Sequence, residues 1–542
     1  MNAASPYIHA SPYPPVPIPQ APLDEVVLAK AAGRGERPAL IDAASGRRLS
    51  YGDLATQVGH FAANLRARGL RRGEVLGVLL PNMPEYAVAF LGAVRAGGVV
   101  TTLNPGYTAR EVHAQLADAR ATRLVTVAAL LETAITAAAG TRVAELVVVG
   151  ADAPTLAAAV AGARAAGAPA PALTAFEVLL REPPTAVAGA PPVAASPRDL
   201  VALPYSSGTT GVSKGVMLTH GNLVANLAQI ASLVPLGDGD VVMAVLPFFH
   251  IYGMEVTMLS GLAQGATLVT MPRFDLEGFL RAHQEYRVTH TYVAPPIVVA
   301  LAKHPMVDRF DLGALRFVLS GAAPLSAELA AEASRRIGVE IVQGYGMTEL
   351  SPVSHFTPPG RNRPGAAGLT VPNTECRIVD PATGASLGPG QDGELWIRGP
   401  QVMAGYLDNP AATAATLDAE GWLHTGDIAR FDADGYLYIV DRLKELIKYK
   451  GFQVPPAELE ALLLTHPAVA DAAVVGEPDP EAGELPVGFV VLKPGQVATA
   501  GQLRDFVAGQ VAHYKQLRSI RFIDAVPKSA SGKILRRQLR GR

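Results

Sequence analysis

One segment rich in glycine, serine and threonine, residues 206–215, carries the clearest chemical signal in the sequence. It reads SSGTTGVSKG and directly follows an apolar run, residues 201–205, that predicts a buried strand. Glycines let backbone N–H groups converge, hydroxyls add donors, and Lys214 adds a positive charge, which together suit a polyphosphate. The Gly-x-x-x-x-Gly-Lys-Ser/Thr order of a Walker loop is absent. The segment therefore predicts a phosphate-binding turn of another type.

Two other interpretations of this segment stay open. A run of Gly, Ser and Thr is also typical of a plain flexible turn. In addition, residues 211–215, GVSKG, match the Gly-x-Ser-x-Gly elbow of serine hydrolases, with Ser213 as nucleophile. That elbow needs a strand, a sharp turn and then a helix, whereas the apolar residues 216–218 predict a returning strand. A serine hydrolase is therefore the second hypothesis.

Composition limits the class of protein and its partners. The chain has 542 residues, of which 49% are hydrophobic and 17% charged, so several domains with large cores are expected. The balance of 46 Lys and Arg against 48 Asp and Glu gives no net field for nucleic acid or anionic lipid. The single cysteine, Cys376, can form neither an internal disulfide nor a thiolate metal cluster. We therefore expect no nucleic-acid partner and no catalytic thiol, and nothing in the sequence implies an obligate protein partner.

The start of the chain and its apolar stretches bear on location. Residues 1–22 are rich in proline and lack the basic start and apolar core of a secretory signal, so an extended lead-in is expected. The apolar stretches at 75–80 and 86–102 are separated by prolines and charges before they could span a bilayer. We expect a cytoplasmic protein without a membrane anchor.

Alternating strand and helix patterns predict an α/β fold. Helical patterns at 54–68 and 86–96 lie between short apolar runs, which are residues 75–80, 99–103, 124–127 and 146–148. Residues 150–196, rich in Ala, Pro and Gly, show little strand character and predict helices and loops. A second series of strand-like runs comprises residues 201–205, 241–246, 267–270, 291–294 and 317–319. Mostly parallel sheets flanked by helices are therefore expected.

The last third of the chain changes character twice. Residues 375–399 contain short alternating strands and turns, which predict a small β subdomain. The charged segment 441–445, DRLKE, then precedes a compact pattern of strands and helices that ends near residue 537. We place a domain boundary there, with an N-terminal domain at 1–440 and a C-terminal domain at 441–542.

Five separated motifs, read together, resemble the adenylate-forming superfamily of acyl-CoA synthetases, firefly luciferases and peptide-synthetase adenylation domains. They are residues 206–215, 343–349 (QGYGMTE), 421–427 (GWLHTGD), 449–451 (YKG) and 527–533 (PKSASGK). Three further stretches are similar to 4-coumarate:CoA ligases and their bacterial relatives, namely residues 247–252 (PFFHIY), 320–325 (SGAAPL) and 448–453 (KYKGFQ). The resemblance runs from about residue 40 to residue 537.

This resemblance implies an ATP-dependent carboxylate:CoA ligase that uses ATP, Mg²⁺ and coenzyme A. An acid and ATP would give an acyl adenylate and diphosphate, and coenzyme A would then displace AMP. The family fold is a large N-terminal domain followed by a small, mobile α+β lid that rotates about a hinge, here Asp441–Arg442, between the two steps. An amide-forming or carrier-loading enzyme and a luciferase-like oxygenase share the first step, and both remain alternatives.

The resemblance also implies residue roles. Lys533 would bridge the carboxylate and phosphate oxygens, and Glu349 would hold Mg²⁺ through a hard oxygen ligand. His250, Lys448 and Gln453 match the other catalytic positions. The ATP or AMP positions are Ser206, Ser207, Gly208, Thr209, Thr210, Lys214, Gln343, Gly344, Tyr345, Thr348, Asp427, Arg442 and Lys533. The coenzyme A positions are Arg273, Lys450 and Gly451.

The acyl pocket is implied in the same way. Its positions, including those facing the adenylate, are Tyr252, Val293, Ser320, Ala322, Gly344, Gly346, Pro352, Val353, Lys444 and Lys448. The mostly small or apolar lining suits an aryl acid of the cinnamate type, with a medium-chain or long-chain fatty acid as the alternative. Glu255 stands where asparagine is common and Leu319 replaces a lysine, so the preferred acid is left open. A carboxylate at 255 could accept a hydrogen bond from a phenol or amine, or point to solvent.

Overall fold

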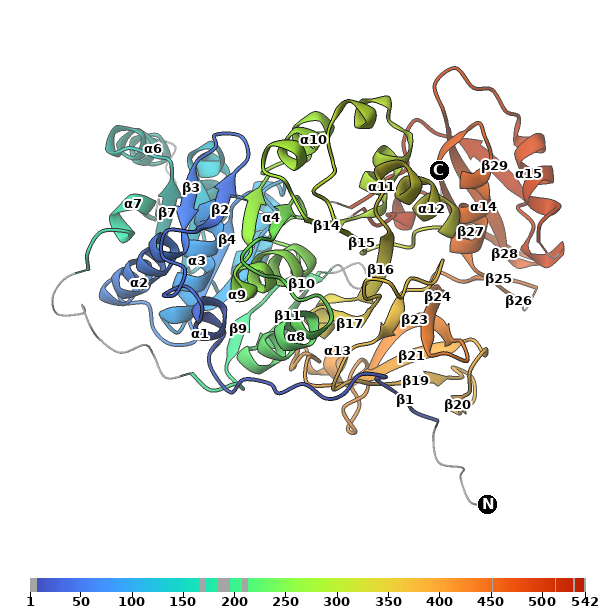
Figure 1. The fold of residues 1–542 in the computed structure, drawn as a ribbon, viewed down its shortest axis with the longest axis horizontal. Coiled ribbons are helices and arrows are strands. Elements are labelled where there is room, and N and C mark those ends of the chain that lie inside the picture. Colours follow the sequence, from blue (N-terminus) through green and yellow to red (C-terminus); the bar gives the residue numbers. More distant parts are fainter. Residues whose placement is uncertain are drawn as a thin grey trace.

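The computed structural model describes residues 7–165, 171–183, 195–206, 213–450, 452–511, 513–529 and 532–540. A large N-terminal part contains two sheets flanked by helices, and a small α+β domain follows at the C-terminal end (Figure 1). The predicted fold class is confirmed. The lead-in from residue 7 runs along the large domain, where β1 (His9–Ala10) pairs with β19 (Glu375–Val379).

The first sheet is parallel over most of its described strands, because helices return the chain to the same edge each time. These strands are β4 (Val75–Leu79), β5 (Val99–Thr102), β6 (Arg123–Val127), β7 (Glu145–Val149), β8 (Ala172–Ala175) and β9 (Leu200–Ala202). The connecting helices include α2 (Tyr51–Ala67), α3 (Pro84–Arg95), α4 (Ala109–Asp118) and α5 (Leu131–Ala138). The four runs predicted between residues 75 and 148 are confirmed as strands.

The second sheet positions most of the motifs. Its parallel strands are β2 (Pro38–Asp42), β12 (Val241–Ala244), β13 (Thr267–Thr270), β14 (His290–Val293), β15 (Phe317–Ser320) and β16 (Ile341–Gly346). Beyond β16 the sheet continues as antiparallel strands, which are β17 (Val353–Phe356), β18 (Gly368–Thr370), β24 (Tyr436–Arg442), β23 (Leu423–Phe431), β21 (Gly393–Arg398) and β19. The β region predicted at 375–399 is therefore the antiparallel end of this larger sheet.

Two local predictions differ from the structure. The run 201–205 is split into β9 and β10 (Tyr205–Ser206), with Pro204 between them, because proline lacks the N–H that a continuous ladder needs. The region 150–196 holds a strand, β8, besides the helices α6 (Ala153–Ala165) and α7 (Phe176–Leu179). That strand forms because its backbone extends the ladder of β7, with Glu145 opposite Ala172.

The returning strand predicted after Ser213 is confirmed as β11 (Lys214–Thr219). It runs antiparallel to β10, with Ser206 opposite Lys214, and also pairs with β9. Because a strand and not a helix follows Ser213, the strand–turn–helix elbow of a serine hydrolase is absent at this position.

A stretch of π-helix, η2 (Tyr252–Leu259), follows the predicted motif at 247–252 and leads into α9 (Ser260–Gln264). The π-helix is rare and is found mostly at functional sites. A methyl group on Gly253 would come within 2.2 Å of the Pro247 carbonyl oxygen, so the tight entry into this helix requires glycine.

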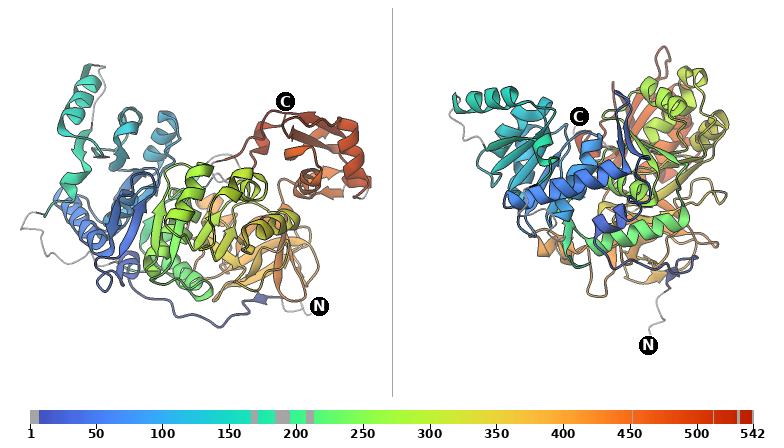
Figure 2. Two further views of the ribbon diagram at one scale, coloured as in Figure 1. Left: turned by 45° about the horizontal axis from the view of Figure 1, so that its top comes forward. Right: turned by 60° about the vertical axis from the view of Figure 1, so that its left-hand side comes forward.

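The C-terminal domain has its own sheet and core. The sheet contains β25 (Ile447–Tyr449), β26 (Phe452–Val454), β27 (Val469–Asp479), β28 (Gly483–Leu492) and β29 (Ser519–Phe522). Helices α14 (Pro456–Thr465) and α15 (Ala500–Ala508) pack on it around buried side chains such as Leu459, Val474 and Leu503. Figure 2 shows this domain as a lobe that projects from the larger body. Among the described residues, no helix is both long and apolar enough to cross a bilayer.

A buried histidine links the packing of the large domain to pH. His283 in α10 (Leu276–Glu285) donates through Nδ1 to the Phe279 carbonyl and accepts at Nε2 from the Thr291 hydroxyl, both at 2.7 Å. Burial lowers the pKa of His283 to about 4, against 6.5 for an ordinary histidine, although the bond to Phe279 opposes the shift. Between pH 4 and 6.5 this histidine binds a proton in the unfolded chain but not in the folded chain. The free energy of unfolding therefore decreases as pH falls from 6.5 towards 4.

We predict that His283→Gln makes the stability less sensitive to pH in this window. The difference in slope between parent and variant should be roughly 1.4 kcal/mol per pH unit, the contribution of one titrating group. Urea unfolding followed by tryptophan fluorescence at several pH values measures it. The exposed His513 provides the control, and His513→Gln should keep the parent slope. Equal slopes for all three proteins would contradict the assignment.

Candidate active site

The two ends of the phosphate-loop motif lie on the paired strands β10 and β11, and the buried carboxylate of Glu349 lies beside them. Glu349, in the short 3-10 helix η4 (Thr348–Leu350), accepts 2.9 Å hydrogen bonds at Oε1 from the hydroxyls of Ser206 and Tyr406. The ammonium of Lys214 lies 4.8 Å from the centre of the Tyr406 ring. Tyr406 therefore contacts Glu349 through its hydroxyl and Lys214 through its ring. The loop residues Ser207, Gly208, Thr209 and Thr210 lie outside the described residues.

A tyrosine, an aspartate and an arginine meet where β16 faces β23 and β24. The Tyr345 hydroxyl donates to Oδ2 of Asp427 at 2.6 Å, and Nε of Arg442 lies 3.4 Å from Oδ1 of the same carboxylate. Register puts Asp427 directly opposite Arg442. Burial raises the pKa of Asp427, whereas Arg442 and the Tyr345 hydroxyl oppose that rise. The Arg442 pKa is raised because Asp427 and Glu445 outweigh the desolvation that would lower it.

Lys533 comes from the opposite end of the chain into this group of charges. It lies in the turn after Lys528, where its N–H donates to the Ser529 hydroxyl at 3.1 Å. Burial lowers the pKa of Lys533, and the positive charge of Arg442 lowers it further. The carboxylates of Asp427, Glu349 and Glu445 act in the opposite direction. Lys533 keeps partial access to solvent.

A direct approach between the two domains fixes this arrangement. A methyl group placed on Gly532, next to Lys533, would lie 3.4 Å from Cδ of Pro296 and 3.6 Å from Cβ of Ala294, at the start of α11 (Pro295–Lys303). Gly532 also has φ +83°, in the left-handed region. The C-terminal loop is therefore seated against the carboxyl end of β14, where ligands of α/β sheets commonly bind.

His250 and Tyr252 form the side of the site opposite Lys533. Burial lowers the pKa of His250 to about 3, and the charge of Lys533 adds to the effect, so this imidazole is neutral near pH 7. Its Nδ1 accepts from the Tyr252 N–H at 3.3 Å. The Tyr252 hydroxyl donates to the Leu319 carbonyl at 3.2 Å, which aims the ring at the end of β15.

The residues expected in the acyl pocket gather at the ends of β14, β15 and β16. Val293, Ser320 and Val353 are buried, and the Ser320 hydroxyl has no hydrogen-bond partner among the described residues. Ala322 has φ +71°, and a cis peptide joins Ser351 to Pro352. Glycine is required at Gly346, because a methyl group there would approach the Pro352 carbonyl oxygen to 2.1 Å. At Gly344 a methyl group would meet the His355 carbonyl oxygen at 3.2 Å.

The two positions expected to depart from the related ligases, Glu255 and Leu319, are both buried. Glu255, one turn after Tyr252 in η2, is fully inaccessible, and neither carboxyl oxygen has a hydrogen-bond partner among the described residues. The possibility that Glu255 points to solvent is therefore wrong. Burial holds the pKa of Glu255 well above the usual range, which favours its protonated form. Leu319 packs its methyl groups near Gly344.

The remaining positions expected to contact the nucleotide, Gln343 and Thr348, lie in β16 and η4. Gln343 accepts from the Leu325 N–H at 3.2 Å, and Thr348 is buried at the start of η4.

The positions expected to contact coenzyme A or act late in the reaction are not gathered with Lys533. Lys444, Lys448 and Lys450 are exposed, and the last two belong to the β25–β26 hairpin, where Gln453 is the register partner of Lys448. Figure 1 shows this hairpin on the side of the C-terminal domain away from β14 and α11. Arg273 is exposed after β13. Gly451 lies outside the described residues.

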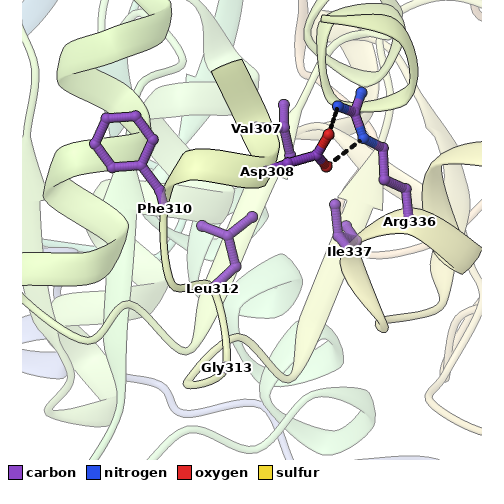
Figure 3. Close-up of a pocket in the computed structure, with 7 residues that line it drawn as sticks. All are labelled: Val307, Asp308, Phe310, Leu312, Gly313, Arg336 and Ile337. Atoms are coloured by element: carbon purple, nitrogen blue, oxygen red, sulfur yellow. Dashed lines mark hydrogen bonds and ion pairs between the residues drawn. The ribbon is translucent and has the colours of Figure 1, made fainter. Parts of the chain in front are cut away.

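A separate surface pocket lies away from these groups (Figure 3). It is lined by Val307, Asp308, Phe310, Leu312, Gly313, Arg336 and Ile337. The Asp308 carboxylate pairs with the Arg336 guanidinium at 2.8 Å across it, which satisfies both charges. None of the predicted site residues lines this pocket.

Comparisons with known proteins now bear on the site. The AMP-binding enzyme family model matches residues 27–407, and the AMP-binding enzyme C-terminal domain matches residues 458–533. The chain belongs to the AMP-binding enzyme family. It is 44% identical over 546 residues to 4-coumarate–CoA ligase 2 of Oryza sativa subsp. japonica, covering 99% of this chain and 95% of that protein. The resemblance stated from the motifs is confirmed.

Solved structures agree with this membership. The anthranilate CoA ligase AuaEII in complex with anthranoyl-AMP superposes with a TM-score of 0.86 at 26% identity, covering 97% of each chain. The amide bond synthetase McbA from Marinactinospora thermotolerans gives 0.84 at 27% identity, covering 96% of this chain and 99% of that one.

We predict that Gly346→Ala distorts the β16–β17 turn and destabilises the protein. The added methyl group overlaps the Pro352 carbonyl oxygen, so a loss of roughly 2–4 kcal/mol is expected. Thermal unfolding measures the change. Gly59→Ala in α2 is the matched control, since nothing lies within 4 Å of its added methyl group and helical Gly→Ala changes are neutral or stabilising. Similar melting temperatures for both variants would contradict the steric argument.

Proposed function

We propose that this protein is an ATP-dependent carboxylate:CoA ligase of the 4-coumarate–CoA ligase type. The observation that carries the proposal is the meeting of Lys533 with Asp427, Arg442 and Glu349 beside the ends of the phosphate-loop motif. The 44% identity to a 4-coumarate–CoA ligase, which extends over 99% of this chain, supports the choice of coenzyme A as acceptor.

In the first step a carboxylate oxygen of the acid attacks the α-phosphorus of ATP, and the bond to diphosphate breaks. Two anions must approach each other, so fixed positive charge lowers the barrier. Lys533 and Lys214 supply it, one from the C-terminal loop and one from β11. Asp427, held by Tyr345 and Arg442, provides carboxylate oxygens for the two ribose hydroxyls.

The residues present fit a magnesium ion held with the phosphates. Mg²⁺ in nucleotide sites commonly binds through one or two carboxylates together with phosphate oxygens. Glu349 offers one buried carboxylate beside Ser206, and no cluster of three metal-binding side chains occurs within the described ranges. The ion would supply charge neutralisation at the phosphates when bound.

In the second step the thiol sulfur of coenzyme A attacks the acyl carbon, and the C–O bond to AMP breaks. Lys448, Lys450 and Gln453 belong to the β25–β26 hairpin region, away from the Lys533 group. A rotation of the C-terminal domain, residues 441–542, about Asp441–Arg442 would exchange Lys533 for this hairpin. Lys444, directly after the hinge, would then approach the adenylate, and Arg273 would meet a coenzyme A phosphate. Neutral His250 supports the site between the two steps.

The preferred acid is an aryl acid of the cinnamate type. Tyr252, Val293 and Val353 offer flat or apolar surface that suits a planar group. A buried carboxyl group at Glu255 is poorly matched to a plain alkyl chain, because an unpaired polar group against hydrocarbon is costly.

Amide formation is the second candidate, because the structural similarity to the amide bond synthetase is almost as high as that to the anthranilate ligase. Both reactions share the adenylate. Offering coenzyme A and a panel of amines together, and analysing the products by mass spectrometry, separates them: a CoA thioester as the main product supports the ligase, and an amide as the main product supports the synthetase.

We predict that Lys533→Ala abolishes most of the first step. ATP–diphosphate exchange with 4-coumarate should fall by roughly 10²–10³, the usual loss when one charge-stabilising donor is removed. Transfer from preformed coumaroyl adenylate to coenzyme A should change little. Lys493→Ala is the control, since this lysine is partly exposed in the same domain and bonds only the Pro467 carbonyl in the described structure. Unchanged exchange in Lys533→Ala would refute the role.

We predict that Glu255→Leu weakens discrimination for a ring hydroxyl. The ratio of kcat/KM for 4-coumarate over cinnamate should fall roughly tenfold or more, because leucine cannot bond the hydroxyl that distinguishes the two acids. Thr257→Val is the matched control, since the Thr257 hydroxyl is also buried in η2 without a partner in the described structure. An unchanged ratio in Glu255→Leu, with both rates intact, would remove Glu255 from the acyl pocket.

A further inference from the structure

The tail that carries Lys533 is attached to the hinge by one arginine. Arg536, in the short 3-10 helix η6 (Arg536–Gln538), is largely buried, with 13% of its side chain exposed. All three guanidinium nitrogens are used. Nη2 bonds both oxygens of Glu460 at 2.7 and 3.0 Å, Nη1 bonds Oε2 of Glu445, and Nε donates to the Val474 carbonyl at 3.2 Å.

Each partner of Arg536 belongs to a different element. Glu460 is in α14, where its Oε1 also accepts from the Val474 N–H at 2.7 Å, and Val474 is in β27. Glu445 lies in the turn directly after β24, and its N–H bonds the Arg442 carbonyl at 2.9 Å. Arg536 therefore joins the tail, the helix, the sheet and the hinge turn at one point.

The charges continue into the active site without a break. Glu445 lies 4.0 Å from Nη1 of Arg442, and Arg442 lies 3.4 Å from Asp427. The order is Asp427, Arg442, Glu445, Arg536, Glu460, which alternates in sign at every member. An alternating row of this kind favours one spacing between its ends, because each charge is attracted to the next.

Arg536 also offsets the carboxylates that face it. Asp441, the second-last residue of β24, accepts hydrogen bonds from the N–H groups of Arg442 at 2.7 Å and Ala457 at 3.0 Å. The second bond connects the hinge to the start of α14. Burial raises the pKa of Asp441 to about 6 and that of Glu460 to about 7, and in both cases the charge of Arg536 opposes the rise. Without Arg536, Asp441, Glu445 and Glu460 would face one another with little compensation.

We propose that Arg536 is a positioning residue that locks the Lys533 loop to the hinge turn, so that Lys533 reaches the ATP site beside Arg442. Only two residues lie between Lys533 and Arg536, and Gly532 lies close to Pro296. Arg536 touches no substrate and acts through Lys533. The inference rests on the proposed function, in which Lys533 serves the first step and not the second.

The test compares Arg536→Met and Arg536→Lys with Arg537→Met. Arg537 is the adjacent residue but is exposed, so its replacement should leave both steps unchanged. ATP–diphosphate exchange with 4-coumarate should fall about tenfold or more in Arg536→Met, whereas thioester formation from coumaroyl adenylate should stay within about twofold. Arg536→Lys keeps the charge but cannot reach three partners, so an intermediate loss is expected.

A double-mutant cycle separates positioning from general structural damage. In a Lys533→Ala background, Arg536→Met should cause little further loss of exchange, because the residue acts only through Lys533. Losses that multiply, or that affect both steps equally, would overturn the inference. If Arg536→Met does not fold, the same comparison with Arg536→Lys decides the question. A parent enzyme that exchanges no diphosphate with any acid would instead reject the proposed function.

Discussion

The whole arrangement depends on holding the ammonium of Lys533 in a largely enclosed place, more than 500 residues from the start of the chain. An isolated charge there would be costly, and the carboxylates of Asp427 and Glu349 offset that cost. Because these acids lie on β23 and η4, the enclosed lysine meets its compensating charges only in the docked arrangement of the C-terminal domain. The compensation of the Lys533 charge and the docking of the C-terminal domain therefore depend on each other.

That constraint explains why the two sets of expected residues are separate. The groups suited to phosphate chemistry meet between the sheets, whereas Lys448 and Lys450 stay exposed on their hairpin. Asp441 and Arg442 end β24, the last strand of the large sheet, so they are the final residues held by that ladder. One placement of the C-terminal domain brings only one of these two sets of residues to the site, as expected for two reactions at the same acyl carbon.

Much of this site could be predicted from sequence because short motifs supply whole loops with their side chains. Tyr345 and Asp427 lie in such motifs, and each occupies the end or interior of a strand that the apolar pattern also indicates. Strand β8 was missed because its residues have weak strand preference and are ordered by pairing with β7. Tyr406 and Arg536 carry no local signal, since their partners lie 57 to 91 residues away in the chain.

Glu255 in η2 and Leu319 at the end of β15 lie on elements that are joined by the hydrogen bond from Tyr252 to the Leu319 carbonyl, and both side chains are buried. Burial raises the pKa of Glu255, which favours its protonated form. A protonated carboxyl can both donate and accept a hydrogen bond, as a phenol can. If Glu255 faces the bound acid, as we propose, a neutral ring hydroxyl therefore suits it better than an anionic substituent.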